Sequence, residues 1–301
     1  MANYLIKTVC LTLLFLLYSC NNNGNDNNIL IKDFDGNYDY GSDFVFCNFD
    51  DSVIEDNDWE KYISEIDSDI IVGMHERLDS SGRTFRLFFR TERQYSSGSN
   101  PIKYCVSKNN NQIVINLDFV LEIGMTCDIG PARCMTDFGK LENGTYNFEI
   151  NIAGKKNIGT LTVTSKNYKL SFANSNQLEI IDTVLNRVPD NTIWGLVGYH
   201  KESTITIVND FLKSLEEAGT VKHNFDVGNY NYFQIDNNGN MLTPEYHGYW
   251  FAIPFAYHFP NNNLSAIEEV VKYYALNYGN SHLHIALYTT TGEQFLSWMI
   301  K

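Results

Sequence analysis

Short runs of alternating apolar and polar residues, separated by turn residues, fill the stretch from Pro101 to Phe172. In the segment from Gln112 to Glu122, apolar residues recur at every second position, so they fall on one face of an extended chain. Another alternating segment follows the turn signal Asn143-Gly144. Strands this short and this closely spaced predict an antiparallel β-sandwich.

The sequence Leu-x-Asn-Gly-Thr-Tyr that begins at Leu141, followed by a strand, resembles immunoglobulin-like modules of exported bacterial proteins. That resemblance implies an immunoglobulin-like sandwich, which we assign to residues 29–185. Further strands are predicted near Phe44 to Asn48, Asp69 to Met74 and Thr84 to Glu92, and a short helix is predicted from Asp58 to Ile66.

From residue 186 onward, strand patterns alternate with helix patterns. One helix is predicted from Ser203 to Ala218, and a second begins at the capping box Ser265-Ala-Ile-Glu268 and ends at Gly279. The resulting order is strand–helix–strand–strand, twice, which is similar to the duplicated units of gyrase-inhibitor-like ligand-binding domains. We therefore expect residues 186–301 to form an α+β domain with two helices on one face of an antiparallel sheet.

The first 28 residues fit neither domain. Val9 to Tyr18 is apolar but shorter than the about 20 residues that span a bilayer, and Lys7 precedes it, so residues 1–19 are predicted to be a secretory signal. Asn21 to Asn28 contains no apolar residue and is predicted to be a disordered tether, within residues 20–28.

The signal ends in Leu17-Tyr18-Ser19-Cys20, which resembles the lipobox of bacterial lipoproteins. The resemblance implies cleavage before Cys20 and acylation of that residue, which would hold the protein on a lipid membrane. Asn21 after the cysteine implies sorting to the outer membrane, facing the periplasm or the cell surface. The Asn-rich tether is similar to those of Bacteroidota surface lipoproteins. The competing interpretation is an ordinary cleaved signal with a chance cysteine.

Beyond the signal and Cys20, four cysteines remain, and an exported protein can join them in three ways. We favour a Cys127–Cys134 bridge around a small loop, which leaves Cys47–Cys105 as a long-range bridge. No Cys-x-x-Cys spacing occurs, which argues against a cysteine metal site.

The formal net charge of −14 is spread along the chain. Such a surface repels nucleic acid, so we expect no nucleic-acid partner. The simpler explanation is that the negative charge keeps the protein soluble.

We primarily expect a protein without a cofactor. Two segments nevertheless resemble metal sites. His282 and His284 are two residues apart on a predicted strand, so both point to one face, where His223, His247 or Glu245 would complete a zinc site. The alternative is that both are ordinary surface histidines. Asp33 to Asp39 resembles a calcium loop, but Tyr38 and Phe44 occupy the places of its Gly and Glu, and turn residues explain it equally.

Aromatic residues crowd the segment between residues 230 and 257. We expect Tyr232, Tyr246, Tyr249 and Trp250 to line a ligand groove, because sugars stack on exposed Tyr and Trp. The competing expectation is that aromatic residues here pack in the core.

The sequence contains no Gly-x-Ser-x-Gly, no His-Glu-x-x-His and no phosphate-binding loop. We therefore expect a non-enzymatic lipoprotein of the cell envelope that binds a small ligand, a glycan or a surface protein. The alternative is a hydrolase with a carboxylate or histidine–metal site in the C-terminal domain.

Overall fold

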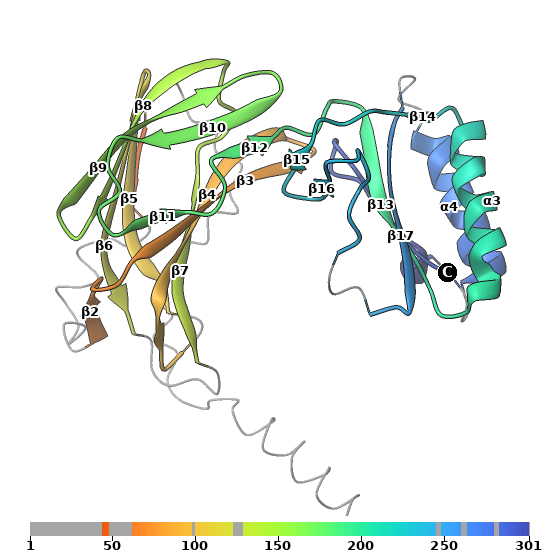
Figure 1. Cartoon of the computed structure of the whole chain (residues 1–301), viewed down its shortest axis with the longest axis horizontal. Helices are drawn as coiled ribbons and strands as arrows, with labels where there is room; N and C mark the ends of the chain where they lie inside the picture. Colours follow the sequence, from red (N-terminus) through yellow and green to blue (C-terminus); the bar gives the residue numbers. More distant parts are fainter. Residues whose placement is uncertain are drawn as a thin grey trace, which may run out of the picture. The chain divides into compact units, whose positions relative to one another are not determined.

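The computed structural model describes residues 44–47, 62–97, 100–122, 129–244, 248–259, 264–279 and 283–300 (Figure 1). The predictions for Cys20, the calcium-like loop 33–39, Cys127, Tyr246 and His282 concern residues outside these ranges. The described part is rich in β-structure, and its two α-helices both lie after residue 204, which confirms the expectation of a mixed, β-rich fold.

A large sheet has the strand order β1-β5-β6-β8-β9-β10-β12, and β2 pairs with β6. Neighbouring strands are antiparallel except β6 and β8, which are parallel. The strands are β1 Phe44–Cys47, β2 Ile63–Glu65, β5 Ile102–Asn109, β6 Gln112–Leu121, β8 Gly144–Ile152, β9 Lys155–Val163, β10 Asn167–Phe172 and β12 Val184–Asn186.

A second sheet has the order β11-β3-β4-β7. Strands β3, β4 and β7 are antiparallel, and β11 runs parallel to β3. The strands are β3 Ile70–Asp79, β4 Gly82–Tyr95, β7 Gly130–Asp137 and β11 Leu178–Ile180.

One hydrophobic core is shared by both sheets. Phe85 and Leu87 of β4 belong to it together with Ile113 and Ile115 of β6, and all four side chains are completely buried. The alternation that predicted the inward face of β6 is therefore confirmed.

Two local predictions in this region are wrong. Residues 63–65 were expected in a helix, but they form β2, which pairs with Phe119–Leu121 of β6. The expected cysteine loop is interrupted by β7, which pairs with β4. In both places, hydrogen bonds to a strand distant in the sequence override the local pattern.

The C-terminal sheet has the antiparallel order β14-β17-β13-β18-β19. Its strands are β13 Thr192–Tyr199, β14 Val221–Lys222, β17 Phe251–His258, β18 His284–Thr289 and β19 Gln294–Leu296, and the helices are α3 Ile205–Glu217 and α4 Leu264–Tyr278, with short 3-10 helices at Glu202–Thr204 and Ser297–Met299. Both α-helices lie on one side of this sheet, as predicted (Figure 1).

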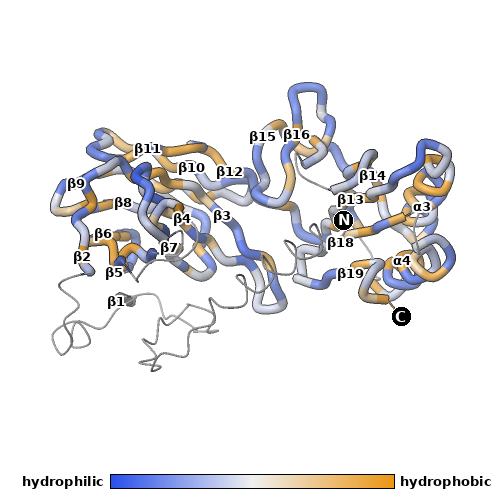
Figure 2. Tube along the Cα trace, turned by 90° about the horizontal axis from the view of Figure 1, so that it is seen from below, coloured by the Kyte–Doolittle hydropathy of each residue, from blue (hydrophilic) through white to orange (hydrophobic). Residues whose placement is uncertain are grey.

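The helices pack on the sheet through one apolar stripe each. Phe211 and Leu215 of α3 and Val271 of α4 are completely buried against Ile193 and Val197 of β13. Figure 2 shows both hydrophobic and hydrophilic residues along each helix, as expected for helices with one buried face.

The two halves of this region interlock. Strand β14, which follows α3, pairs with β17, and strand β18, which follows α4, pairs with β13. Each half thus places the strand after its helix beside the first strand of the other half. The second half has the order strand–helix–strand–strand, formed by β17, α4, β18 and β19.

The first half departs from the predicted order after β14. The next two strands, β15 Gly228–Asn229 and β16 Gln234–Ile235, pair with each other in a small separate sheet. Tyr230, Phe233 and Ile235 instead pack with Trp194 in a third apolar cluster. Burial of these large side chains competes successfully with extension of the sheet.

Candidate functional site

The face of the C-terminal sheet that points away from the helices is only partly covered. Along β13, Ile193 and Val197 belong to the core beneath the helices, whereas Leu196 points to the opposite face. Leu196 lies between Pro254 of β17 and Ala286 of β18, and all three residues are half-buried. Apolar side chains therefore form the middle of this open face.

Tyr249 covers one end of the open face. Its ring lies on Gly198, where a Cβ atom would be 2.1 Å from Tyr249 Cδ2. The same ring stacks on the imidazole of His284, which lies opposite Gly198 in the β13–β18 pair, with 5.1 Å between ring centroids. The absence of a side chain at Gly198 is what allows the aromatic ring to lie against the sheet.

His200 and Trp250 complete a group of four rings. The His200 ring centroid is 5.5 Å from Tyr249, 6.3 Å from His284 and 6.4 Å from Trp250. The Trp250 side chain is 80% exposed. We refer to His200, Tyr249, Trp250 and His284 as the aromatic–histidine cluster.

The electrostatics of this cluster favour uncharged rings. Burial, and then the neighbouring His200, lower the pKa of His284, so that its imidazole is neutral at pH 7. Burial raises the pKa of Tyr249, which keeps its phenol protonated. Neutral imidazole offers one hydrogen-bond donor and one acceptor, so the cluster can combine ring stacking with hydrogen bonding.

Of the residues predicted to line a groove, the structure brings Tyr249 and Trp250 together but places Tyr232 elsewhere. The Tyr232 ring lies 4.9 Å from Trp194, and its hydroxyl accepts a hydrogen bond of 2.9 Å from the backbone N–H of Leu78. Tyr232 therefore lies beside Trp194 of the third apolar cluster rather than with Tyr249 and Trp250.

His284 takes the predicted position on the face opposite to Leu283 and Ile285, which are completely buried. The proposed contribution of His223 to a metal site with His284 is wrong. His223 lies 6.1 Å from His258, which pairs with Thr192, whereas His284 pairs with Gly198 at the other end of β13. In the part of the chain that the structure describes, no three His, Cys, Asp or Glu side chains gather as a metal site requires.

The predicted Cys127–Cys134 bridge is also wrong, because Cys134 is a free cysteine. It lies opposite Phe89 in the β4–β7 pair, and its side chain packs against the core between the two N-terminal sheets. Cys105 is disulfide-bonded, and the backbone of Cys47 lies directly opposite it in the β1–β5 pair. This register fits the predicted Cys47–Cys105 bridge.

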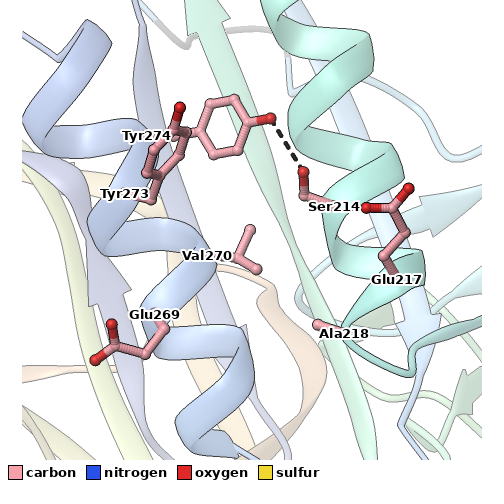
Figure 3. Close-up of a pocket in the computed structure, with 7 residues that line it drawn as sticks. All are labelled: Ser214, Glu217, Ala218, Glu269, Val270, Tyr273 and Tyr274. Carbon is pink, nitrogen blue, oxygen red and sulfur yellow. Dashed lines mark hydrogen bonds between the residues drawn. The ribbon is translucent and has the colours of Figure 1, made fainter.

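A groove of about 390 Å³ lies between α3 and α4. Figure 3 shows Tyr274 of α4 directed toward Ser214 of α3, and their hydroxyl oxygens are 3.0 Å apart. Glu217 and Glu269 stand on opposite helices, and Glu217 pairs with Lys213 at 3.3 Å. Since the Ser214 and Tyr274 hydroxyls contact each other and Glu217 is paired with Lys213, the groove offers fewer specific contacts than the aromatic–histidine cluster.

Sequence reasoning overlooked two members of the site, Gly198 and His200. A glycine inside a strand pattern often marks a place where another group lies close to the backbone, so the sequence could have indicated Gly198. His200 directly follows strand β13. Only the β13–β17 register shows that this end of β13 lies near residue 249.

Comparisons with protein-family models, with curated proteins and with solved structures find no match to this chain. Among the described residues, no helix has both the length and the apolar character needed to cross a membrane.

Proposed function

We propose that this chain is a non-enzymatic, lipid-anchored protein of the cell envelope that binds a neutral glycan through the aromatic–histidine cluster. The proposal rests on the exposure of Trp250 beside Tyr249. The Tyr249 ring lies against the sheet because Gly198 beneath it has no side chain.

The chemistry of the cluster suits carbohydrate. The apolar faces of sugar rings stack on Trp and Tyr, and sugar hydroxyls can exchange hydrogen bonds with neutral imidazoles such as His284. The net charge of −14 disfavours anionic ligands, so a neutral glycan is the better candidate.

The proposal also assigns different roles to the two regions of the chain. Residues 29–185 would form an immunoglobulin-like sandwich that follows the tether in the chain, and residues 186–301 would form the binding domain. The two main apolar clusters belong to separate stretches of the chain, Ile66 to Leu185 and Ile193 to Ile300, which supports the division.

Glycan binding is tested with the full chain carrying Cys20→Ala, screened against an array of neutral oligosaccharides. Trp250→Ala and Tyr249→Ala should each weaken the strongest interaction about tenfold or more, because each removes a stacking surface. Trp298→Ala is the matched control, since Trp298 is also an exposed tryptophan, at 53%. Absence of any bound glycan, or an equal effect of Trp298→Ala, would refute the proposal.

The rival hydrolase is favoured by a single observation, the 6.3 Å between the ring centroids of His200 and His284. Elemental analysis of the untagged protein distinguishes the two functions. About one equivalent of zinc that disappears in His284→Ala would support a histidine–metal site.

The lipid anchor has its own test. The Cys20→Ala protein should lose its acyl chains and leave the membrane fraction, because the tether alone contains nothing apolar. Membrane retention equal to that of the unchanged protein would contradict the anchor.

A further inference from the structure

The arginines of this acidic chain are unevenly paired. The sequence has seven arginines, and all of them lie in the described part. Five form ion pairs with carboxylates there: Arg77 with Asp79 and Asp137, Arg83 with Glu76 and Asp190, Arg86 with Asp137, Arg93 with Asp67, and Arg187 with Glu76.

The remaining two, Arg90 and Arg133, stand directly opposite each other on β4 and β7. Both are exposed, and neither guanidinium forms a hydrogen bond or ion pair with any residue that the structure describes. Like charges in directly opposed positions of a sheet repel each other and destabilise the pair of strands. An arrangement of this kind becomes favourable when an anion binds to both guanidinium groups.

An apolar row lies beside the arginine pair on the same face of the sheet. Phe88 and Met135 are opposite each other, two residues along from Arg90 and Arg133. Ile181, at the β11 edge, reaches over Gly73 of β3, where a Cβ atom would be 3.8 Å from Ile181 Cδ1. Ile181 is 56% exposed and Met135 is 39% exposed.

The next row of the face is electrically balanced. Arg86 lies between His75 and Asp137, and its guanidinium contacts the Asp137 carboxylate at 2.9 Å. Arg90 and Arg133, which form no ion pair with a described carboxylate, thus stand together in one row of the sheet, with an exposed apolar row next to it. Glu179 lies in the same row, on the far side of Ile71 from Arg90.

We infer that this face, formed by Arg90, Arg133, Phe88, Met135 and Ile181, binds an acidic segment of a partner protein. The planar guanidinium groups bind carboxylates through paired hydrogen bonds, and the apolar row accepts neighbouring apolar side chains. Arg, Met and aromatic residues are the types that protein interfaces favour.

Other anionic partners fit this face less well. The net charge of −14 repels extended polyanions and anionic membranes, whereas a short acidic segment needs only the local pair of arginines. Sulfated or phosphorylated sugars offer ring faces but no flexible apolar side chains that could pack among Phe88, Met135 and Ile181. The inference is independent of the proposed glycan site, which lies on another sheet.

The test uses the full chain with Cys20→Ala and a displayed library of random peptides. Selected peptides should combine Asp or Glu with apolar residues, and changing their acidic residues to amides should weaken binding about tenfold. Arg90→Ser and Arg133→Ser should have an effect of the same size. Arg90→Lys should bind with intermediate affinity, because it keeps the charge but loses the planar donors.

Arg93→Ser is the matched control, because Arg93 is an exposed arginine of the same strand that is already paired with Asp67. It should leave peptide binding unchanged. The thermal stability of Arg90→Ser should be equal to or above that of the parent, which separates lost binding from lost folding. Peptides without acidic enrichment, an equal loss in Arg93→Ser, or arginine-dependent binding of heparin fragments or phosphatidylglycerol vesicles in place of peptides would overturn the inference.

Discussion

Glu76 is the most deeply buried charged residue in the described part of the chain, at 1% exposure. Its carboxylate pairs with Arg83 and Arg187, accepts a hydrogen bond of 3.0 Å from the Tyr168 hydroxyl, and accepts one from the backbone N–H of Val188. A carboxylate in this position is stable only because charged and polar donors surround it. The network joins β3, β4 and β10 to the chain that leads into the C-terminal sheet.

Glu76→Gln should therefore destabilise the protein by about 3 kcal/mol, because Arg187 loses its carboxylate partner and Arg83 keeps only the exposed Asp190. Urea unfolding measures the change in free energy. Glu179→Gln is the control, since Glu179 is exposed on the neighbouring strand β11, and it should change stability very little. A loss in Glu76→Gln no greater than in the control would show that the network contributes little.

His284 makes stability depend on pH. Its pKa is lowered in the folded protein by burial and by His200, so the unfolded chain binds a proton more readily. The resulting contribution to stability is present above the ordinary histidine pKa of about 6.5 and is lost as pH falls from there through the folded pKa.

We expect the melting temperature to fall between pH 7 and pH 5 and this fall to be smaller in His284→Gln. Thermal unfolding followed by circular dichroism over that range measures both proteins. His223→Gln, which removes an exposed histidine, is the control and should retain the full pH dependence. Identical pH profiles of His284→Gln and the parent would contradict the assignment.

At the scale of elements, strand β13 organises both faces of the C-terminal sheet. Strand β13 pairs with β17 on one side and β18 on the other, and Gly195 and Gly198 of β13 take part in both pairings. A Cβ atom at Gly195 would lie 2.0 Å from the backbone oxygen of Ala286, whereas the three atoms nearest to one at Gly198 all belong to the Tyr249 ring. Gly195 is therefore needed for the pairing of the strands, and Gly198 for the position of Tyr249 in the aromatic–histidine cluster.

The two substitutions to alanine should separate folding from binding. Gly195→Ala should lower the melting temperature strongly, because backbone cannot move aside without breaking the β13–β18 pairing. Gly198→Ala should displace Tyr249 and abolish glycan binding at a smaller cost in stability, about 1–3 kcal/mol. Calorimetry and the oligosaccharide array measure the two effects. Unaltered glycan binding in Gly198→Ala would show that Tyr249 need not lie on the sheet.

At the scale of the whole molecule, the cysteines differ in chemistry. Cys105 is disulfide-bonded, whereas Cys134 is a free thiol whose pKa is raised well above its usual range by burial. A buried thiol of this kind is protonated and inert, because the thiolate is the reactive form.

Iodoacetamide should therefore label Cys134 only after unfolding, and Cys134→Ser should not alter the disulfide content. Cys105→Ser should destabilise the protein by about 2–5 kcal/mol, as loss of a native bridge commonly does. Mass spectrometry of labelled peptides and urea unfolding measure these outcomes. Rapid labelling of Cys134 in the native protein would contradict its burial.

Several features of the fold needed only neighbouring residues in the sequence. The inward faces of β6 and β8, the buried stripes of α3 and α4, and the turn between β18 and β19 follow from local periodicity and turn residues. For the same reason, the sequence was sufficient to place His284 on the face opposite to Leu283 and Ile285.

Other features depended on which distant segments become neighbours. The register between strands far apart in the chain decides four of them: strand β7, the free state of Cys134, the separation of Tyr232 from Tyr249, and the opposed Arg90 and Arg133, which form no ion pair with a described residue. By itself the sequence determined the class of fold and the inward faces of its main elements, because both arise from a period of two or of 3.6 residues. Only the tertiary structure decided the two candidate binding faces, because a shift of one residue in strand register would turn every side chain of a face to the other side.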